Sequence, residues 1–163
     1  MTELWVADSG IRQLHARFDD AVWRKDADAF ADLFTEDGEW KIAGFHFKGR
    51  TDLREGFAKL LGLCKRVRII QGMPLLEVGE RAATGRISIT ELTQMADGSS
   101  AMALGTYYDW YVEDGDRWLF QKRHWGFHYR GPFDVSAPFA DYPDFGAPPN
   151  MPGADEPTFV RKK

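Results

Sequence analysis

The N-terminal part of the chain has the hydrophobic pattern of an amphipathic helix. Apolar residues recur at helical spacing between residues 10 and 34, at Ile11, Leu14, Phe18, Val22, Ala29, Phe30 and Leu33. Ser9 can cap the start of this helix, and Asp26 can act as a second cap that separates a short helix over residues 27–34. A further helix is predicted to start at Thr51, with Leu53, Phe57, Leu60 and Leu61 on one side.

From residue 66 onward the pattern changes to that of strands. Strands are predicted over 67–71, 75–78, 82–94, 102–113 and 118–129, with Pro74 bending the chain between the first two. Asp97-Gly98 and Asp114-Gly115 predict hairpin turns between the long strands. Two shorter pieces over 39–47 follow a predicted turn at Asp37-Gly38 and break at Gly44. Helices followed by an antiparallel meander predict an α+β domain.

The last segment of the chain differs in composition from the rest. Residues 131–163 contain seven of the eight prolines together with several aromatic residues. We therefore expect a pocket domain over residues 1–132 and a tail over 133–163. The tail is predicted to lie on the domain, or on a neighbouring copy, as far as about residue 147 and to be loose beyond it. A frayed tail is the alternative.

Composition excludes several classes of protein. A net charge of −4 offers no electrostatic footprint for nucleic acid or an anionic membrane, and no apolar run is long enough to span a bilayer. The lone Cys64 and a start that lacks a secretion signal predict a cytoplasmic protein without disulfides. No phosphate loop or redox motif is present, so no cofactor is expected. Aromatic residues make up 14% of the chain, enough to line a large apolar cavity as well as a core.

Four segments together resemble the SnoaL-like branch of the nuclear transport factor 2-like superfamily. They are IRQLHARF at 11–18, DADAFADLFTEDGEW at 26–40, FKGR at 47–50 and YYDWYVEDGDRW at 107–118. The resemblance extends over residues 10 to about 132. It implies a cone-shaped, strongly curved antiparallel sheet wrapped around N-terminal helices, a cystatin-like arrangement that encloses an apolar pocket. It also implies a homo-oligomer, either a dimer or a trimer. Relatives include scytalone dehydratase, ketosteroid isomerase, polyketide cyclases, a dehydrochlorinase and non-enzymes, so the fold alone does not define the function.

The resemblance also reveals a departure. The dehydratase and dehydrochlorinase relatives use a His as base on the first long strand and an Asp on the first helix to orient it. Aligned without gaps, the Asp position falls on Trp23 and the His position on Ile69. Neither side chain can move a proton, and Asp26 is better explained as a helix cap.

Three other residues are candidate catalytic groups. His15 and Asp19 are four residues apart, so their side chains can meet on one helical face. The carboxylate and burial act in opposite directions on the imidazole, which can place its pKa near neutral pH. A polar pair that lines a cavity or faces solvent is the alternative. On the last strand, alternation places Gln121, Trp125, Phe127 and Tyr129 on the face of Arg123, and the resemblance turns that face inward. Arg123 can bind a carboxylate or stabilise an enolate; an ion pair with Asp109 or Glu91 is the alternative.

The other polar candidates carry weaker signals. Alternation places His124 and His128 with Phe120 on the outer face of the last strand, where a third metal ligand is missing; we expect no metal and an exposed or intersubunit position. His46 near the pocket mouth is either a proton shuttle or a surface residue. Tyr107 and Tyr111 are expected to pack in the core. The residues expected to line the pocket are Trp23, Trp40, Phe45, His46, Ile69, Trp125 and Phe127.

These candidates give one leading functional hypothesis and two alternatives. The leading one is a cofactor-free acid–base lyase or isomerase for a small, apolar or aromatic cyclic metabolite. His15 would transfer the proton, Asp19 would orient it and Arg123 would stabilise the anion. A non-catalytic module that binds a small molecule is the second hypothesis. The third is an interaction protein whose pocket is filled by its own Trp side chains.

Overall fold

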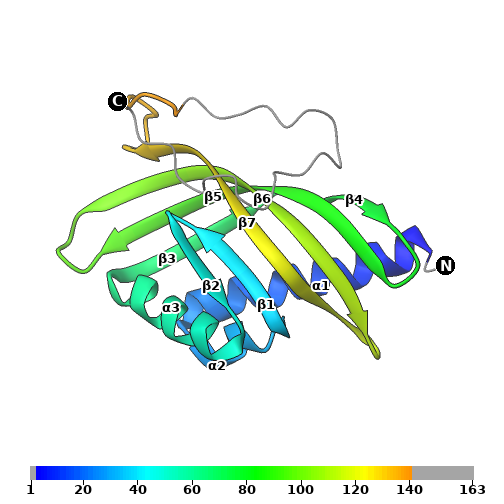
Figure 1. The fold of residues 1–163 in the computed structure, drawn as a ribbon. Helices are drawn as coiled ribbons and strands as arrows, with labels where there is room; N and C mark the ends of the chain where they lie inside the picture. The colour runs from blue at the N-terminus through cyan, green and yellow to red at the C-terminus, as the bar shows by residue number, and fades with distance from the viewer. Residues whose placement is uncertain (1–2, 141–163) are drawn as a thin grey trace.

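The computed structural model, which describes residues 3–140, consists of three helices and a seven-stranded sheet (Figure 1). In chain order the elements are α1 (Leu4–Arg24), α2 (Ala27–Ala31), β1 (Phe34–Ile42), β2 (Phe45–Lys48), α3 (Arg50–Gly62), β3 (Cys64–Gln71), β4 (Leu75–Val78), β5 (Ala82–Met95), β6 (Ser100–Asp114) and β7 (Arg117–Gly131). The strand order is β2-β1-β7-β6-β5-β3, and β4 also pairs with β5. Because β1 runs parallel to β7, the sheet is mixed rather than purely antiparallel as predicted.

The helices cover one face of a strongly curved sheet (Figure 1). Helix α1 buries one stripe that includes Ala7, Ile11 and Phe18, at the spacing of a single helical face. Phe30 of α2 stacks on Phe57 of α3 with ring centroids 4.2 Å apart. The predicted α+β architecture, a curved sheet folded around N-terminal helices, is confirmed.

Several predicted helix boundaries shift. Helix α1 begins at Leu4, so Ser9 lies inside it rather than at its cap. Asp26 caps α2 as predicted, because its carboxylate accepts a hydrogen bond from the Ala29 amide at 2.9 Å. Helix α3 begins directly after Gly49, whose φ of 81° suits glycine, so Thr51 is a helical residue and not the cap.

The predicted turn at Asp37-Gly38 is also wrong. Both residues lie within β1, at a point where the pairing of β1 with β7 shifts register between Phe34 and Glu39. The break at Gly44 is confirmed, since β1 ends at Ile42 and β2 starts at Phe45. A turn dipeptide can therefore be absorbed as a local irregularity of a strand.

Strand β7 contains two irregularities that change which side chains face the helices. Opposite β6, Tyr111 pairs with Phe120 and Trp110 with Lys122, so Gln121 is an extra residue. A second shift leaves His128 as an extra residue between the partners of Leu104 and Gly105. Each bulge reverses the inward parity of the strand.

The first bulge corrects two predictions from strict alternation. Phe120, expected on the outer face, is fully buried in the core, and Gln121, expected to face inward, is exposed. His124 and His128 were expected in an exposed or intersubunit position; His124 is 1% exposed and His128 is partly buried within the chain itself.

The beginning of the tail packs against the end of β7. The Tyr129 hydroxyl donates to the Pro132 carbonyl at 2.8 Å, and its ring lies 4.9 Å from that of Phe139. The Ala140 amide donates to the His128 carbonyl at 2.7 Å. Residues 141–147, predicted to dock as well, lie outside the described residues. The division into a domain over 1–132 and a tail over 133–163 stays a prediction.

Between residues 3 and 140, no helix combines the length and apolar character needed to cross a membrane.

The second bulge of β7 gives a test of the packing. A Cβ on Gly105 would lie 2.3 Å from two ring carbons of Trp125 and 2.6 Å from the Gly126 carbonyl oxygen. We expect Gly105→Ala to lower the free energy of unfolding by about 1–3 kcal/mol, measured by urea denaturation, because overpacking forces the sheet to shift. Gly62→Ala is the control, since nothing lies within 4 Å of its Cβ. Equal stability of the two variants would show that the ring does not press on Gly105.

Candidate functional site

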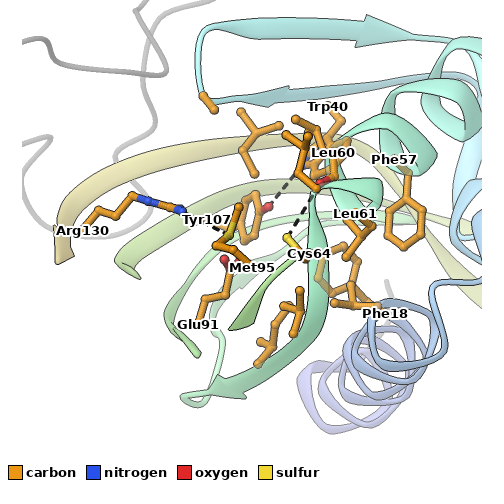
Figure 2. Close-up of a pocket in the computed structure, with 16 residues that line it drawn as sticks. Phe18, Trp40, Phe57, Leu60, Leu61, Cys64, Glu91, Met95, Tyr107 and Arg130 are labelled. Atoms are coloured by element: carbon orange, nitrogen blue, oxygen red, sulfur yellow. Dashed lines mark hydrogen bonds between the residues drawn. The ribbon is translucent and has the colours of Figure 1, made fainter. Parts of the chain in front are cut away.

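An apolar pocket lies between the helices and the covered face of the sheet (Figure 2). Its larger part is a cavity of about 190 Å³, with residues of α1, α3 and five strands in its wall. An adjoining cavity of about 130 Å³ shares six of the lining residues, so we treat the two as one pocket. The apolar and aromatic lining includes Phe18, Val22, Trp40, Ile42, Phe57, Leu60, Leu61, Val67, Ile69, Ile89, Trp125 and Phe127.

Two charged side chains, Glu91 and Arg130, line this pocket within the described part of the chain. The Thr93 hydroxyl donates to Glu91 Oε1 at 2.8 Å. The guanidinium of Arg130 lies 3.8 Å from the Met95 sulfur. Neither charge has an ion-pair partner among residues 3–140, so both are available to a ligand.

Tyr107 adds a neutral hydrogen-bonding group to the pocket wall. Its hydroxyl accepts a hydrogen bond from Trp40 Nε1 at 3.1 Å, and within residues 3–140 no acceptor takes its own proton. Burial raises the pKa of Tyr107, although the positive charge of Arg123 opposes that rise. The phenol therefore stays protonated and can donate a hydrogen bond into the pocket.

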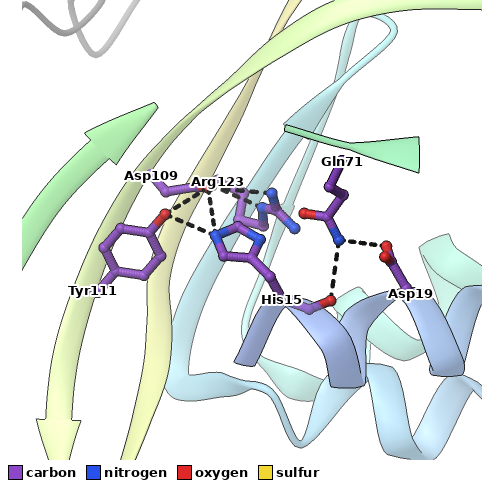
Figure 3. Close-up of polar contacts among 6 residues, drawn as sticks. All are labelled: His15, Asp19, Gln71, Asp109, Tyr111 and Arg123. Carbon is purple, nitrogen blue, oxygen red and sulfur yellow. Dashed lines mark hydrogen bonds and ion pairs between the residues drawn. The ribbon is translucent and has the colours of Figure 1, made fainter. Parts of the chain in front are cut away.

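A buried polar network of His15, Asp109, Tyr111 and Arg123 lies next to the pocket (Figure 3). Arg123 Nε donates to Asp109 Oδ1 at 2.8 Å, and an Nη donates to Oδ2 at 3.2 Å. The Tyr111 hydroxyl donates to the same carboxylate at 3.0 Å and lies 3.0 Å from His15 Nε2. Both members of the ion pair are fully buried.

The network holds His15 neutral. Burial lowers the pKa of His15 well below its ordinary value, and the nearby Arg123 charge lowers it further. Burial also raises the pKa of Asp109, but the two hydrogen bonds from Arg123 oppose this effect. A carboxylate with a bidentate guanidinium partner is the arrangement that best tolerates removal from water.

The predicted pairing of His15 with Asp19 is not formed. The imidazole instead contacts Tyr111, while the Asp19 carboxylate accepts a hydrogen bond from the Gln71 amide. Gln71 also donates to the His15 carbonyl at 3.1 Å, so β3 supplies a side chain that ties both residues of α1 to the sheet (Figure 3). Burial raises the pKa of Asp19.

Arg123 forms the ion pair with Asp109 that was the alternative prediction for it. Its guanidinium carbon lies 4.3 Å from the Phe18 ring centroid and 3.9 Å from that of Tyr107. These two aromatic residues also line the pocket, whereas His15, Asp19 and Arg123 do not. Arg123 therefore supports the pocket wall from behind, and none of the three candidate catalytic residues forms part of its surface.

The residues expected to line the pocket divide into two groups. Trp40, Ile69, Trp125 and Phe127 do line it. Trp23 and Phe45 are not part of the lining. Trp23 is 51% exposed with Arg68 over its ring, and Phe45 is 41% exposed and stacks on Phe47.

His46 also lies away from the pocket lining. It is exposed and pairs with Glu39 at 2.6 Å. Among the described residues, no group of three His, Cys, Asp or Glu side chains could hold a metal.

Sequence reasoning missed Glu91 and Arg130 as pocket residues for different reasons. Glu91 lies on the same face of β5 as the core residues Ile87 and Ile89. Alternation along this strand therefore could have predicted a carboxylate that faces the interior. Arg130 has the parity that strict alternation sends outward, and the bulge at His128 turns it inward.

Comparison with known proteins identifies the family to which this chain belongs. Residues 7–124 match the SnoaL-like domain, and the chain belongs to that family. A comparison with curated proteins finds no match in sequence.

Solved structures share the fold. A protein of unknown function from Mycobacterium tuberculosis is 26% identical, with a TM-score of 0.69 over 82% of this chain and 78% of that one. A putative scytalone dehydratase from Novosphingobium aromaticivorans is 18% identical, with a TM-score of 0.73 over 82% and 91%. A hexachlorocyclohexane dehydrochlorinase from Novosphingobium barchaimii is 17% identical, with a TM-score of 0.72 over 79% and 91%. The superfamily and the cystatin-like architecture implied by the sequence are thereby confirmed.

The ion pair predicts a specific pattern of stability changes. Asp109→Ala leaves the Arg123 charge buried without a partner, and we expect a loss of about 3–5 kcal/mol in the free energy of unfolding. The double variant with Arg123→Met should lose less than the sum of the single variants. Asp8→Ala, which removes the exposed partner of Arg12, should cost less than about 1 kcal/mol. Additive losses at Asp109 and Arg123 would contradict the coupling.

His15 predicts a pH dependence of stability. Above pH of about 6.5 the imidazole is neutral in both the folded and the unfolded chain. Below that pH the unfolded chain binds a proton that the folded chain does not, so stability falls with a slope of up to about 1.4 kcal/mol per pH unit. The slope should be smaller in His15→Gln when urea denaturation is measured between pH 7 and pH 5.5. Identical slopes would mean that His15 takes up its proton in the folded state.

Proposed function

We propose that this SnoaL-like protein binds a small, mostly apolar cyclic metabolite in the pocket and catalyses a cofactor-free proton transfer on it, as a lyase or isomerase. The observation that carries the proposal is the position of Glu91, a carboxylate without an ion-pair partner among residues 3–140, in a cavity with a mostly apolar wall. Glu91 pairs across the sheet with Ile69, the position where the resemblance places the catalytic His of the relatives. A proton acceptor is therefore present on the neighbouring strand.

Glu91 can act as the base, and Tyr107 can stabilise the negative charge that forms on the substrate. The Glu91 carboxylate removes a proton from a carbon next to a carbonyl group, and the electron pair moves onto the carbonyl oxygen. The Tyr107 hydroxyl donates a hydrogen bond to that oxygen. The protonated Glu91 then returns its proton to a different carbon of the same ring system, which completes an isomerisation without a second acid. An elimination would also require a proton for the leaving group.

The names of two structures with the same fold support this class of reaction, but they do not identify a substrate for this chain. Two structures of the same fold are named as a putative dehydratase and a dehydrochlorinase. Both are less than 25% identical to this chain, so the chemistry proposed for it rests on Glu91 and Tyr107.

A non-catalytic binding module is the second candidate function. The observation that favours it is the apolar pair Trp23 and Ile69 at the positions of the relatives' catalytic Asp and His. The cavity of about 190 Å³ left beside Trp40 favours both ligand-binding functions over a pocket filled by Trp side chains. The homo-oligomer and the cytoplasmic location stay predictions.

Substitution of Glu91 tests the catalytic proposal. One- and two-ring β,γ-unsaturated ketones are suitable probes, because their conversion to conjugated enones is followed by absorbance. Glu91→Gln keeps the size of the side chain but removes the base, so we expect turnover to fall by about 10²–10⁴-fold. The matched control is Glu80→Gln, which removes an exposed carboxylate and should turn over at the wild-type rate.

Two results would redirect the interpretation. Wild-type turnover by Glu91→Gln would exclude Glu91 as the base. Tight binding of a probe by the wild-type protein without any turnover would favour the binding module.

A further inference from the structure

We infer that Arg130 binds an acidic substituent of the ligand, so that the pocket takes a ring compound carrying a carboxylate. This inference deepens the proposed function because it uses the same pocket. It concerns binding alone, so it holds whether or not Glu91 transfers a proton.

The register of the sheet places Arg130 in a row with Glu91. Arg130 of β7 pairs with Ala103 of β6, and Ala103 pairs with Glu91 of β5. Adjacent strands lie about 4.8 Å apart, so the backbones of the two charged residues are separated by about 10 Å. Ala103, which lines the pocket between them, leaves that space open because its side chain is a single methyl group.

The bulge at His128 directs Arg130 toward this space. Figure 2 shows its side chain extending from β7 toward Met95 and Tyr107, with the guanidinium at the edge of the pocket. Within residues 3–140 the guanidinium contacts the Met95 sulfur, a weak acceptor, and no carboxylate there pairs with its planar fork of donors. A guanidinium fork matches a carboxylate in geometry as well as charge, because two parallel N–H groups can meet both oxygens.

The charges also set the orientation of the ligand. Coulomb energy falls with distance, so a carboxylate in contact with Arg130 is attracted more strongly than it is repelled by Glu91, which forms no ion pair with Arg130. The carboxylate therefore lies at Arg130, at the exposed end of the pocket, and the ring extends past Ala103 toward Trp40 and Phe57. This orientation leaves the carbon skeleton, and not the carboxylate, next to Glu91.

The test compares two probes that differ in charge but have nearly the same shape, 2-naphthoate and 2-naphthamide. Their dissociation constants are measured by calorimetry. Protection of Cys64 from a thiol reagent is measured in parallel, because this residue lines the pocket and is the only cysteine. We expect the wild-type protein to bind 2-naphthoate about 10- to 100-fold more tightly than 2-naphthamide, as for a charge-assisted bidentate contact.

Arg130→Gln should remove this preference while leaving the affinity for 2-naphthamide unchanged. Arg117→Gln changes the net charge equally at the opposite end of β7 and should keep the preference. Ala103→Leu should weaken both probes because it fills the space between the charges. Thermal unfolding of each variant verifies that it is folded; Arg130 is exposed, so its replacement should be tolerated.

Three results would overturn the inference: equal affinity of the wild-type protein for both probes, a retained preference in Arg130→Gln, or binding of neither probe with Cys64 unprotected. Failure of the catalytic proposal is distinguishable, since Glu91→Gln should keep the preference for 2-naphthoate even where Glu91 proves not to be the base.

Discussion

The ion pair between Arg123 and Asp109 is the interaction on which the rest of this structure depends. Two opposite charges are removed completely from water here, and only their paired hydrogen bonds make this tolerable. The pair fixes β7 against β6, while Tyr111 connects it to His15 of α1. Aromatic rings pack around the guanidinium, and two of them form part of the pocket wall. The shape of the apolar cavity thus depends on a polar contact behind it.

The sequence predicted the elements well because they follow local rules. Helical spacing and alternation require only neighbouring residues, so most of α1 and the three long strands were readable. The cap at Asp26 was readable for the same reason. The site was harder to predict, because the position of a side chain across a sheet depends on pairing with a distant strand. His15 and Asp19 have the spacing of a helical pair, yet each finds a partner on another element.

A polar residue inside this fold can either stabilise the structure or bind a ligand. The two roles differ in how deeply the side chain is buried and in whether other side chains already pair with it. His15, Asp109 and Arg123 are buried, and hydrogen bonds connect them to one another directly or through Tyr111, which suits a structural role. Glu91 and Arg130 are partly exposed, lack ion-pair partners among residues 3–140 and face a cavity. Charged groups of this second kind are the ones with interaction capacity left for a ligand. The same distinction separates His15, Asp19 and Arg123, the residues that the sequence pattern selected, from the two charged residues that line the pocket.

The bulges of β7 have a consequence for how this protein can diverge. In a regular strand, a new pocket-facing residue arises only by substitution at a position that already points inward. Here the extra residue at His128 decides which of the residues after it point inward. Deletion of one residue at this point would turn the Arg130 side chain outward and turn the side chains of the residues next to it toward the pocket. Related chains can therefore exchange the chemistry at the pocket mouth through a change in strand length, with no new side chain introduced.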